Sequence, residues 1–148
     1  MTILTRDAIA LIMLIALSFS GCSDSEECTL IGCENGVVLT FEGADGRAIT
    51  AFKGSVTAGA QVTTVECGPG AEVPSTNYLC HQNELFLRVS NLEEVALNIH
   101  ATDSDNLAFI GAVGLNFEPQ YPNGEACAAA CERAEATVVM VETQAVAN

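Results

Sequence analysis

The residue types in this chain that could do chemistry are seven cysteines, two histidines and two neighbouring aspartates. Nucleophilic and acid–base catalysis need side chains that converge, and His81 and His100 stand apart from any such partner in the sequence. The chain also lacks a GxSxG elbow, an HExxH helix, a glycine-rich phosphate loop and a dinucleotide fingerprint. We therefore predict that the protein is not an enzyme, with no catalytic residue and no cofactor.

Asp103 and Asp105 are two residues apart, and two carboxylates at this spacing can share a Ca²⁺ ion. An EF-hand loop counted from Asp103 would need a glycine at its sixth position and a glutamate at its twelfth, where the chain has Ala108 and Gly114. The run 103–106 is rich in residues that form turns. A turn is the favoured interpretation, and a calcium-dependent adhesion domain remains an alternative.

The cysteines indicate oxidation rather than metal binding. Neither close pair, Cys28 with Cys33 or Cys127 with Cys131, has the two-residue gap typical of zinc sites, so we predict no metal site. Cys67 and Cys80 flank one loop and are expected to form a disulfide. Two further bridges are expected between the N-terminal and C-terminal pairs, in either pairing. In this arrangement, Cys22 is the one cysteine that is not expected to form a disulfide.

Cys22 follows a leader of the kind that directs secretion. Arg6 precedes the apolar run 8–17, which is too short to span a bilayer comfortably and ends in small residues before Cys22. Ser20, Gly21 and Cys22 resemble the lipobox of bacterial lipoproteins, although Phe19 stands where that family usually has leucine. Ordinary signal-peptide cleavage after Ser20 is the alternative. An odd cysteine count favours the lipoprotein, because lipid on Cys22 leaves six cysteines to pair.

The resemblance to lipoproteins implies three parts of the chain. Residues 1–21 would be a signal peptide that is removed, residues 22–27 a lipidated (palmitate-bearing) cysteine with a short acidic tether, and residues 28–148 a single domain. The lipid on Cys22 would anchor the domain in the cell envelope. In some bacteria, an aspartate directly after the lipidated cysteine resembles a signal for retention in the inner membrane. This chain has Ser23 at that position, which favours the outer membrane.

The net charge is strongly negative, with nineteen Asp and Glu residues against five Lys and Arg residues. Such a surface repels nucleic-acid phosphates and anionic lipid headgroups, so we predict no nucleic-acid partner and no basic membrane-docking face. The lipid would have to do the membrane binding that the charge of the domain opposes.

The hydrophobic pattern of residues 28–148 alternates with a period of two, which predicts strands. The runs 95–101 and 107–117 should form a hairpin around the turn 103–106. About seven short strands predict an all-β fold, an antiparallel β-sandwich of immunoglobulin-like architecture. The remaining strands are expected around residues 37–42, 49–56, 61–67, 84–90 and 137–142.

Residues 125–136 are rich in alanine and glutamate, which are strong helix formers, and predict a short helical turn. The loop after Cys67 contains Asn77 and Tyr78, residue types that binding loops use. We expect a non-enzymatic, lipid-anchored binding or structural module, with these two residues as candidates for contact with an unidentified envelope or extracellular protein or glycan. The alternative from another class is an envelope accessory enzyme or inhibitor.

Overall fold

The computed structural model of the protein describes residues 33–71, 76–103, 106–125 and 127–143. These residues form nine β-strands and contain no helix, so the all-β class is confirmed. No helix in the described part of the chain could therefore cross a membrane. The strands are β1 (Gly36–Gly43), β2 (Phe52–Ala58), β3 (Gln61–Cys67), β4 (Tyr78–His81), β5 (Glu84–Leu87), β6 (Glu94–Ala101), β7 (Leu107–Gly114), β8 (Glu118–Gln120) and β9 (Cys131–Glu142).

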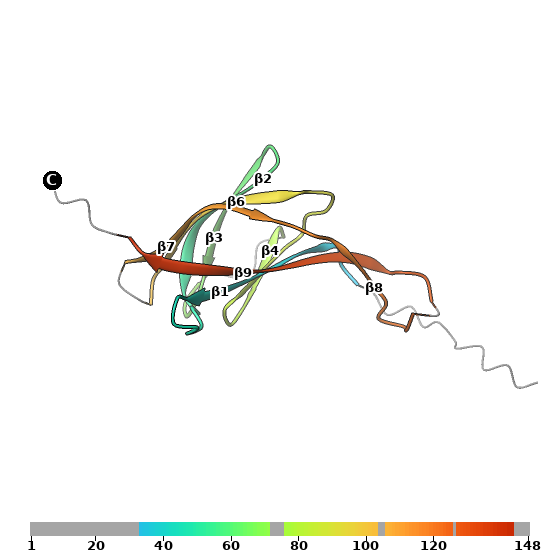
Figure 1. Ribbon diagram of the computed structural model, residues 1–148, viewed down its shortest axis with the longest axis horizontal. Helices are drawn as coiled ribbons and strands as arrows, with labels where there is room; N and C mark the ends of the chain where they lie inside the picture. The colour runs from blue at the N-terminus through green and yellow to red at the C-terminus, as the bar shows by residue number, and fades with distance from the viewer. Residues whose placement is uncertain (1–32, 72–75, 104–105, 126, 144–148) are drawn as a thin grey trace, which may run out of the picture.

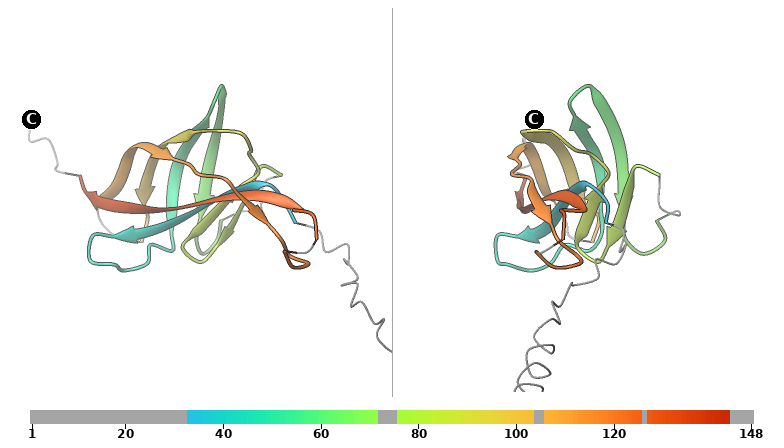
Figure 2. Two further views of the ribbon diagram at one scale, coloured as in Figure 1. Left: turned by 45° about the vertical axis from the view of Figure 1, so that its right-hand side comes forward. Right: turned by 90° about the vertical axis from the view of Figure 1, so that its right-hand side faces the viewer.

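The strands form one continuous sheet in the order β3-β2-β6-β7-β9-β1-β5-β4, and β8 pairs with β9 beside this path. The sheet is mixed, because β1 and β9 run parallel from Gly36 opposite Arg133 to Gly43 opposite Met140. All other pairs are antiparallel. The sheet curls nearly into a closed barrel, with β9 running along its length (Figures 1 and 2). The expected antiparallel, immunoglobulin-like sandwich of about seven strands is therefore corrected to a nine-stranded mixed sheet.

The core lies inside this curl and is built from alternate residues of the strands. Phe41 of β1 and Phe52 of β2 pack together at its centre, with ring centroids 4.3 Å apart. Aliphatic side chains fill most of the remaining space. The fully buried large side chains are Phe41, Phe52, Leu39, Ile49, Leu85, Ile99, Met140, Val37, Val56, Val65, Val95 and Val138.

The hairpin predicted around residues 103–106 is confirmed as β6 and β7, which pair from Glu94 opposite Gly114 to His100 opposite Ala108. The expected strand 61–67 coincides with β3. One residue of the neighbouring strand β2, Gly54, lies where an added Cβ would collide with the main chain of Asn98. Glycine at this position allows β2 and β6 to approach closely.

The helical turn expected at residues 125–136 is wrong, because β9 begins at Cys131 and the described residues before it are not helical. Helix propensity is a weak preference that tertiary contacts override. Here the parallel ladder with β1 supplies backbone hydrogen bonds, and Ala134 fits completely into the core. Cys33 is joined by a disulfide to Cys131, and Glu132 N donates to Asn35 Oδ1 at 2.8 Å. These contacts hold the start of β9 beside the start of β1.

The two ends of the sheet, β3 and β4, meet at what we call the β3–β4 seam. A disulfide joins Cys67 of β3 to Cys80 of β4, with Cα atoms 5.7 Å apart, and this is the pair of cysteines expected from the sequence. Glu66 N donates to Tyr78 Oη at 3.3 Å. The sheet order contains no ladder between these two strands, so the curl is closed here by side chains.

Candidate functional site

Besides the β3–β4 seam, the sheet is weakly closed between β7 and β9. These strands pair only where Leu107 meets Glu142 and Ala108 meets Val141. At the other end of the same gap, β8 pairs with β9, with Glu118 opposite Arg133. Between these pairings, residues 109–117 and residues 134–140 face each other without a hydrogen-bonded ladder in the described structure. We call this stretch the β7–β9 opening.

The core is less covered beneath this opening than elsewhere. Val95 and Ile99 on β6 are completely buried, whereas Val113 and Phe109, which lie opposite them on β7, are only partly buried. The same partial burial extends past the end of β7. The partly buried apolar residues that border the opening are Phe109, Val113, Leu115, Phe117 and Ala136. The opening therefore leaves apolar surface of the core accessible to solvent.

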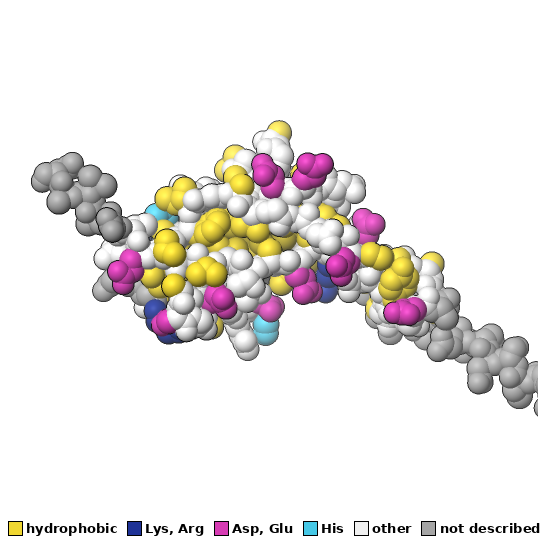
Figure 3. Space-filling model, in the orientation of Figure 1, with side chains coloured by type: hydrophobic (Ala, Val, Ile, Leu, Met, Phe, Trp, Pro, Cys, Tyr) yellow, Lys and Arg dark blue, Asp and Glu magenta, His cyan; other side chains and the backbone are white. Residues whose placement is uncertain are grey.

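Exposed apolar side chains on the outer face extend this surface. Ile110 of β7 is 69% exposed, and Val141 and Val139 of β9 are 54% and 41% exposed. A space-filling view shows apolar side chains gathered along the middle of this face, with acidic side chains around them (Figure 3). The exposed residues Glu118, at one end of the opening, and Glu135, along the β9 side, contribute to the acidic surroundings. The surface combines an apolar band with negative charge.

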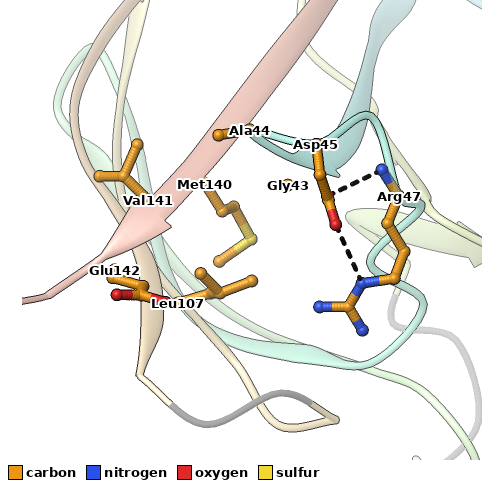
Figure 4. A pocket seen from close by; sticks show the side chains of 8 residues that line it. All are labelled: Gly43, Ala44, Asp45, Arg47, Leu107, Met140, Val141 and Glu142. Carbon is orange, nitrogen blue, oxygen red and sulfur yellow. Dashed lines mark hydrogen bonds and ion pairs between the residues drawn. The ribbon is translucent and has the colours of Figure 1, made fainter.

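A hollow of about 310 Å³ lies next to the β7–β9 pairing (Figure 4). Leu107, Met140 and Val141 line its apolar side. Across from them, the turn after β1 presents Asp45 and Arg47, whose side chains form an ion pair at 3.9 Å. This hollow can receive an apolar side chain beside a charged group, but its lining contains no cysteine, serine or histidine that could act as a nucleophile or base.

The structure places the two residues predicted for binding at the β3–β4 seam, away from the opening. Tyr78 is partly buried, and its hydroxyl accepts the hydrogen bond from Glu66 N. Asn77 is exposed, and its carbonyl oxygen accepts a hydrogen bond from Arg88 N at 3.1 Å. Tyr78 therefore contributes to closing the sheet. Residues 72–75 of the same loop lie outside the described residues.

The two histidines do not come together. His81 is exposed on β4, whereas His100 is exposed on β6 with its Nε2 3.0 Å from Asn98 Oδ1. Asp103 Oδ2 lies 3.3 Å from Thr50 N and accepts a hydrogen bond from it, which ties the β6–β7 turn to the segment before β2. Asp105 lies outside the described residues. Within the described part of the chain, no three acidic, histidine or cysteine side chains cluster as metal ligands would.

Three of the expected cysteine sites lie at the end of the molecule where β8 and β9 meet. Cys33 pairs with Cys131, with Cα atoms 5.6 Å apart. Cys127 is also disulfide-bonded, and its partner is outside the described residues. Cys28, the candidate lipidation site Cys22 with its tether, and the leader 1–21 lie outside the described residues.

Sequence analysis did not single out Ile110, Val139 or Val141 as candidate site residues. A signal was present in the strand pattern: Ile110 stands out of phase with the inward series Leu107, Phe109 and Val113, and Val139 breaks the alternation of β9. An apolar residue on the expected solvent face of a strand marks a surface that the rest of the chain does not cover.

Comparisons with protein-family models, with curated proteins and with solved structures found no match to this chain.

Proposed function

We propose that the protein is a non-enzymatic, lipid-anchored binding module of the bacterial cell envelope, attached through Cys22. The observation that carries the binding role is the apolar band along the β7–β9 opening, where Ile110 is 69% exposed. Exposed apolar surface with a polar rim is typical of interaction sites. The disulfides Cys33–Cys131 and Cys67–Cys80 support an oxidising, exported compartment.

The partner that fits this surface is a protein segment with apolar side chains and a positive charge. Apolar side chains would cover Ile110, Val139 and the partly buried residues beneath them. Basic side chains would be attracted by Glu118 and Glu135 and by the net charge of −14. Nucleic acid and anionic lipid do not fit, because both carry the same sign of charge as the protein.

A photo-crosslinking residue at Ile110, in the exported protein on intact cells, tests the binding role. We expect one or a few proteins to be captured, and the same probe at His81, an exposed position on β4, should not capture them. Adding Val139→Glu should reduce capture at position 110, because a carboxylate would have to be buried in the apolar contact. Equal capture at both positions, or none at Ile110, would remove the opening as the binding site.

The anchor has its own test. The intact mass of the purified protein should show acyl chains on Cys22 and no free thiol, and Cys22→Ala should be released or remain unprocessed. An unlipidated Cys22 with a free thiol would refute the anchor and leave the crosslinking result unaffected.

The two alternatives from the sequence separate by direct measurements. A calcium-dependent adhesion domain should melt at a higher temperature in millimolar Ca²⁺, because a ligand that binds only the folded state stabilises it. An accessory enzyme that uses the histidines should lose activity in His81→Ala or His100→Ala.

A further inference from the structure

The outer edge of β3 is a second feature that the proposed function does not use. Glu66 directs its backbone groups away from β2: its N–H donates to Tyr78 Oη, and its carbonyl oxygen lies 3.7 Å from Cys80 Sγ. Alternate residues of an antiparallel strand direct their backbone groups to the same edge. The N–H and C=O groups of Thr64 and Val62 therefore point out of the sheet as well.

In the described part of the chain, no strand lies beside these groups. β4 reaches only the Glu66–Cys67 end of β3, and the described structure contains no hydrogen bond to the outward backbone groups of Val62 or Thr64. Both residues are exposed, Val62 to 65%. The tip of the β2–β3 hairpin projects beyond the rest of the sheet (Figure 2). An extended strand could therefore approach this edge from solvent.

The edge also lacks the usual protection against pairing. Natural edge strands carry charges, proline or bulges that discourage a second strand. The short edge strand β8 has such features in Glu118 and Pro119. In contrast, the chain has no charged residue and no proline between Lys53 and Glu66, and these two residues face each other at the base of the hairpin.

We propose that β3 is a self-association edge, at which a second copy of this chain pairs antiparallel about a two-fold axis at Thr63. In this register Val62 of each copy lies opposite Thr64 of the other, so the outward N–H and C=O groups form two hydrogen-bonded residue pairs. Both cross-strand pairs join β-branched side chains, which pack well on a sheet surface.

The absence of charged residues between Lys53 and Glu66 favours an occupant whose own pairing edge is uncharged, and the same edge of a second copy meets this condition. Two copies with a net charge of −14 each repel one another over most orientations. In the proposed register Glu66 lies opposite Ala60, so no like charges are placed opposite each other along the pairing. Salt should strengthen the dimer, because it screens the remaining repulsion between the acidic bodies.

A pair of double variants tests this register. Val62→Glu with Thr64→Glu places a carboxylate opposite a carboxylate at both cross-strand pairs. Val62→Lys with Thr64→Glu instead places a lysine opposite a glutamate. All four substituted side chains replace exposed ones, so each variant should keep the fold of the monomer, which circular dichroism would verify.

Analytical ultracentrifugation of the full protein, purified in detergent, is the readout. We expect a reversible dimer whose affinity is higher at about 0.5 M than at about 0.05 M salt. The Glu/Glu variant should weaken it about tenfold or more, and the Lys/Glu variant should retain it within about threefold. A monomer under all conditions, or a dimer that the Glu/Glu variant leaves intact, would overturn the proposal. Because this readout involves neither Cys22 lipidation nor capture at Ile110, its failure is distinguishable from failure of the proposed function.

Discussion

The β3–β4 seam and the β7–β9 opening are the two places where this sheet is weakly closed, and they are closed by different means. At the first, a disulfide and the Tyr78 hydroxyl join strands that share no ladder. At the second, a short backbone pairing and the β8–β9 ladder bound a stretch that leaves Phe109 and Val113 partly uncovered. A covalent bond constrains the chain without covering apolar surface, whereas a short ladder leaves surface available for a partner.

The largest expected effect is at the disulfide-closed seam. Cys67→Ala with Cys80→Ala removes a bridge between residues 13 apart, and the chain-entropy model gives a loss of about 3 kcal/mol in unfolding free energy. Thermal unfolding followed by circular dichroism should show a melting temperature lower by roughly 10 °C. A change of less than about 2 °C would show that other contacts close this seam.

A disulfide introduced at the opening would make the two regions alike. Ala108 and Val141 are register partners on β7 and β9, and Cα atoms of opposed antiparallel residues lie within the range that a disulfide spans. Oxidised Ala108→Cys with Val141→Cys should gain about 1–3 kcal/mol over the wild type in chemical denaturation. A serine pair at the same positions is the control. An equal gain in unfolding free energy in that control would show that the disulfide is not the cause of the stabilisation.

A smaller effect is expected from the hydroxyl of Tyr78. Tyr78→Phe removes the acceptor for Glu66 N and should cost about 1 kcal/mol, whereas Tyr121→Phe, an exposed tyrosine on the loop after β8, should cost less. Equal losses in urea titrations of the two variants would mean that the hydroxyl does not help to close the seam.

The smallest effect on stability is expected at the opening itself. Ile110→Ser changes an exposed side chain, and its unfolding free energy should stay within about 0.5 kcal/mol of the wild type. Capture of the partner should nevertheless fall, since the apolar contact is lost. A destabilised Ile110→Ser protein would place this side chain in the structural core rather than in a binding surface.

Much of the sheet could be predicted from the sequence because its strands alternate. Leu39 and Leu85 belong to the alternating apolar residues of the expected strands 37–42 and 84–90 and are completely buried, and β3 and the β6–β7 hairpin were found where expected. β4 and β8 are short, and local pattern does not distinguish such strands from loops.

The start of β9 and the candidate site could not be derived in the same way. Alanine at positions 134 and 136 favours a helix locally, yet Ala134 is buried opposite Val37 of a distant parallel strand. The opening exists because β7 and β9 diverge beyond Ala108 and Val141, which depends on pairing between distant segments. Tyr78 was expected to face a partner, and its hydroxyl instead bonds to Glu66.

The parallel ladder between β1 and β9 has a consequence for the order of folding. Its two strands come from opposite ends of the described chain, so the centre of the sheet cannot assemble until the last strand has been synthesised. Pairings between such distant segments are slow to form, because the intervening loop must close before any contact offsets its entropy. A nascent chain of this protein would therefore lack its central β1–β9 ladder until residues 131–142 have been synthesised, although the local β2–β3 and β6–β7 hairpins could pair earlier.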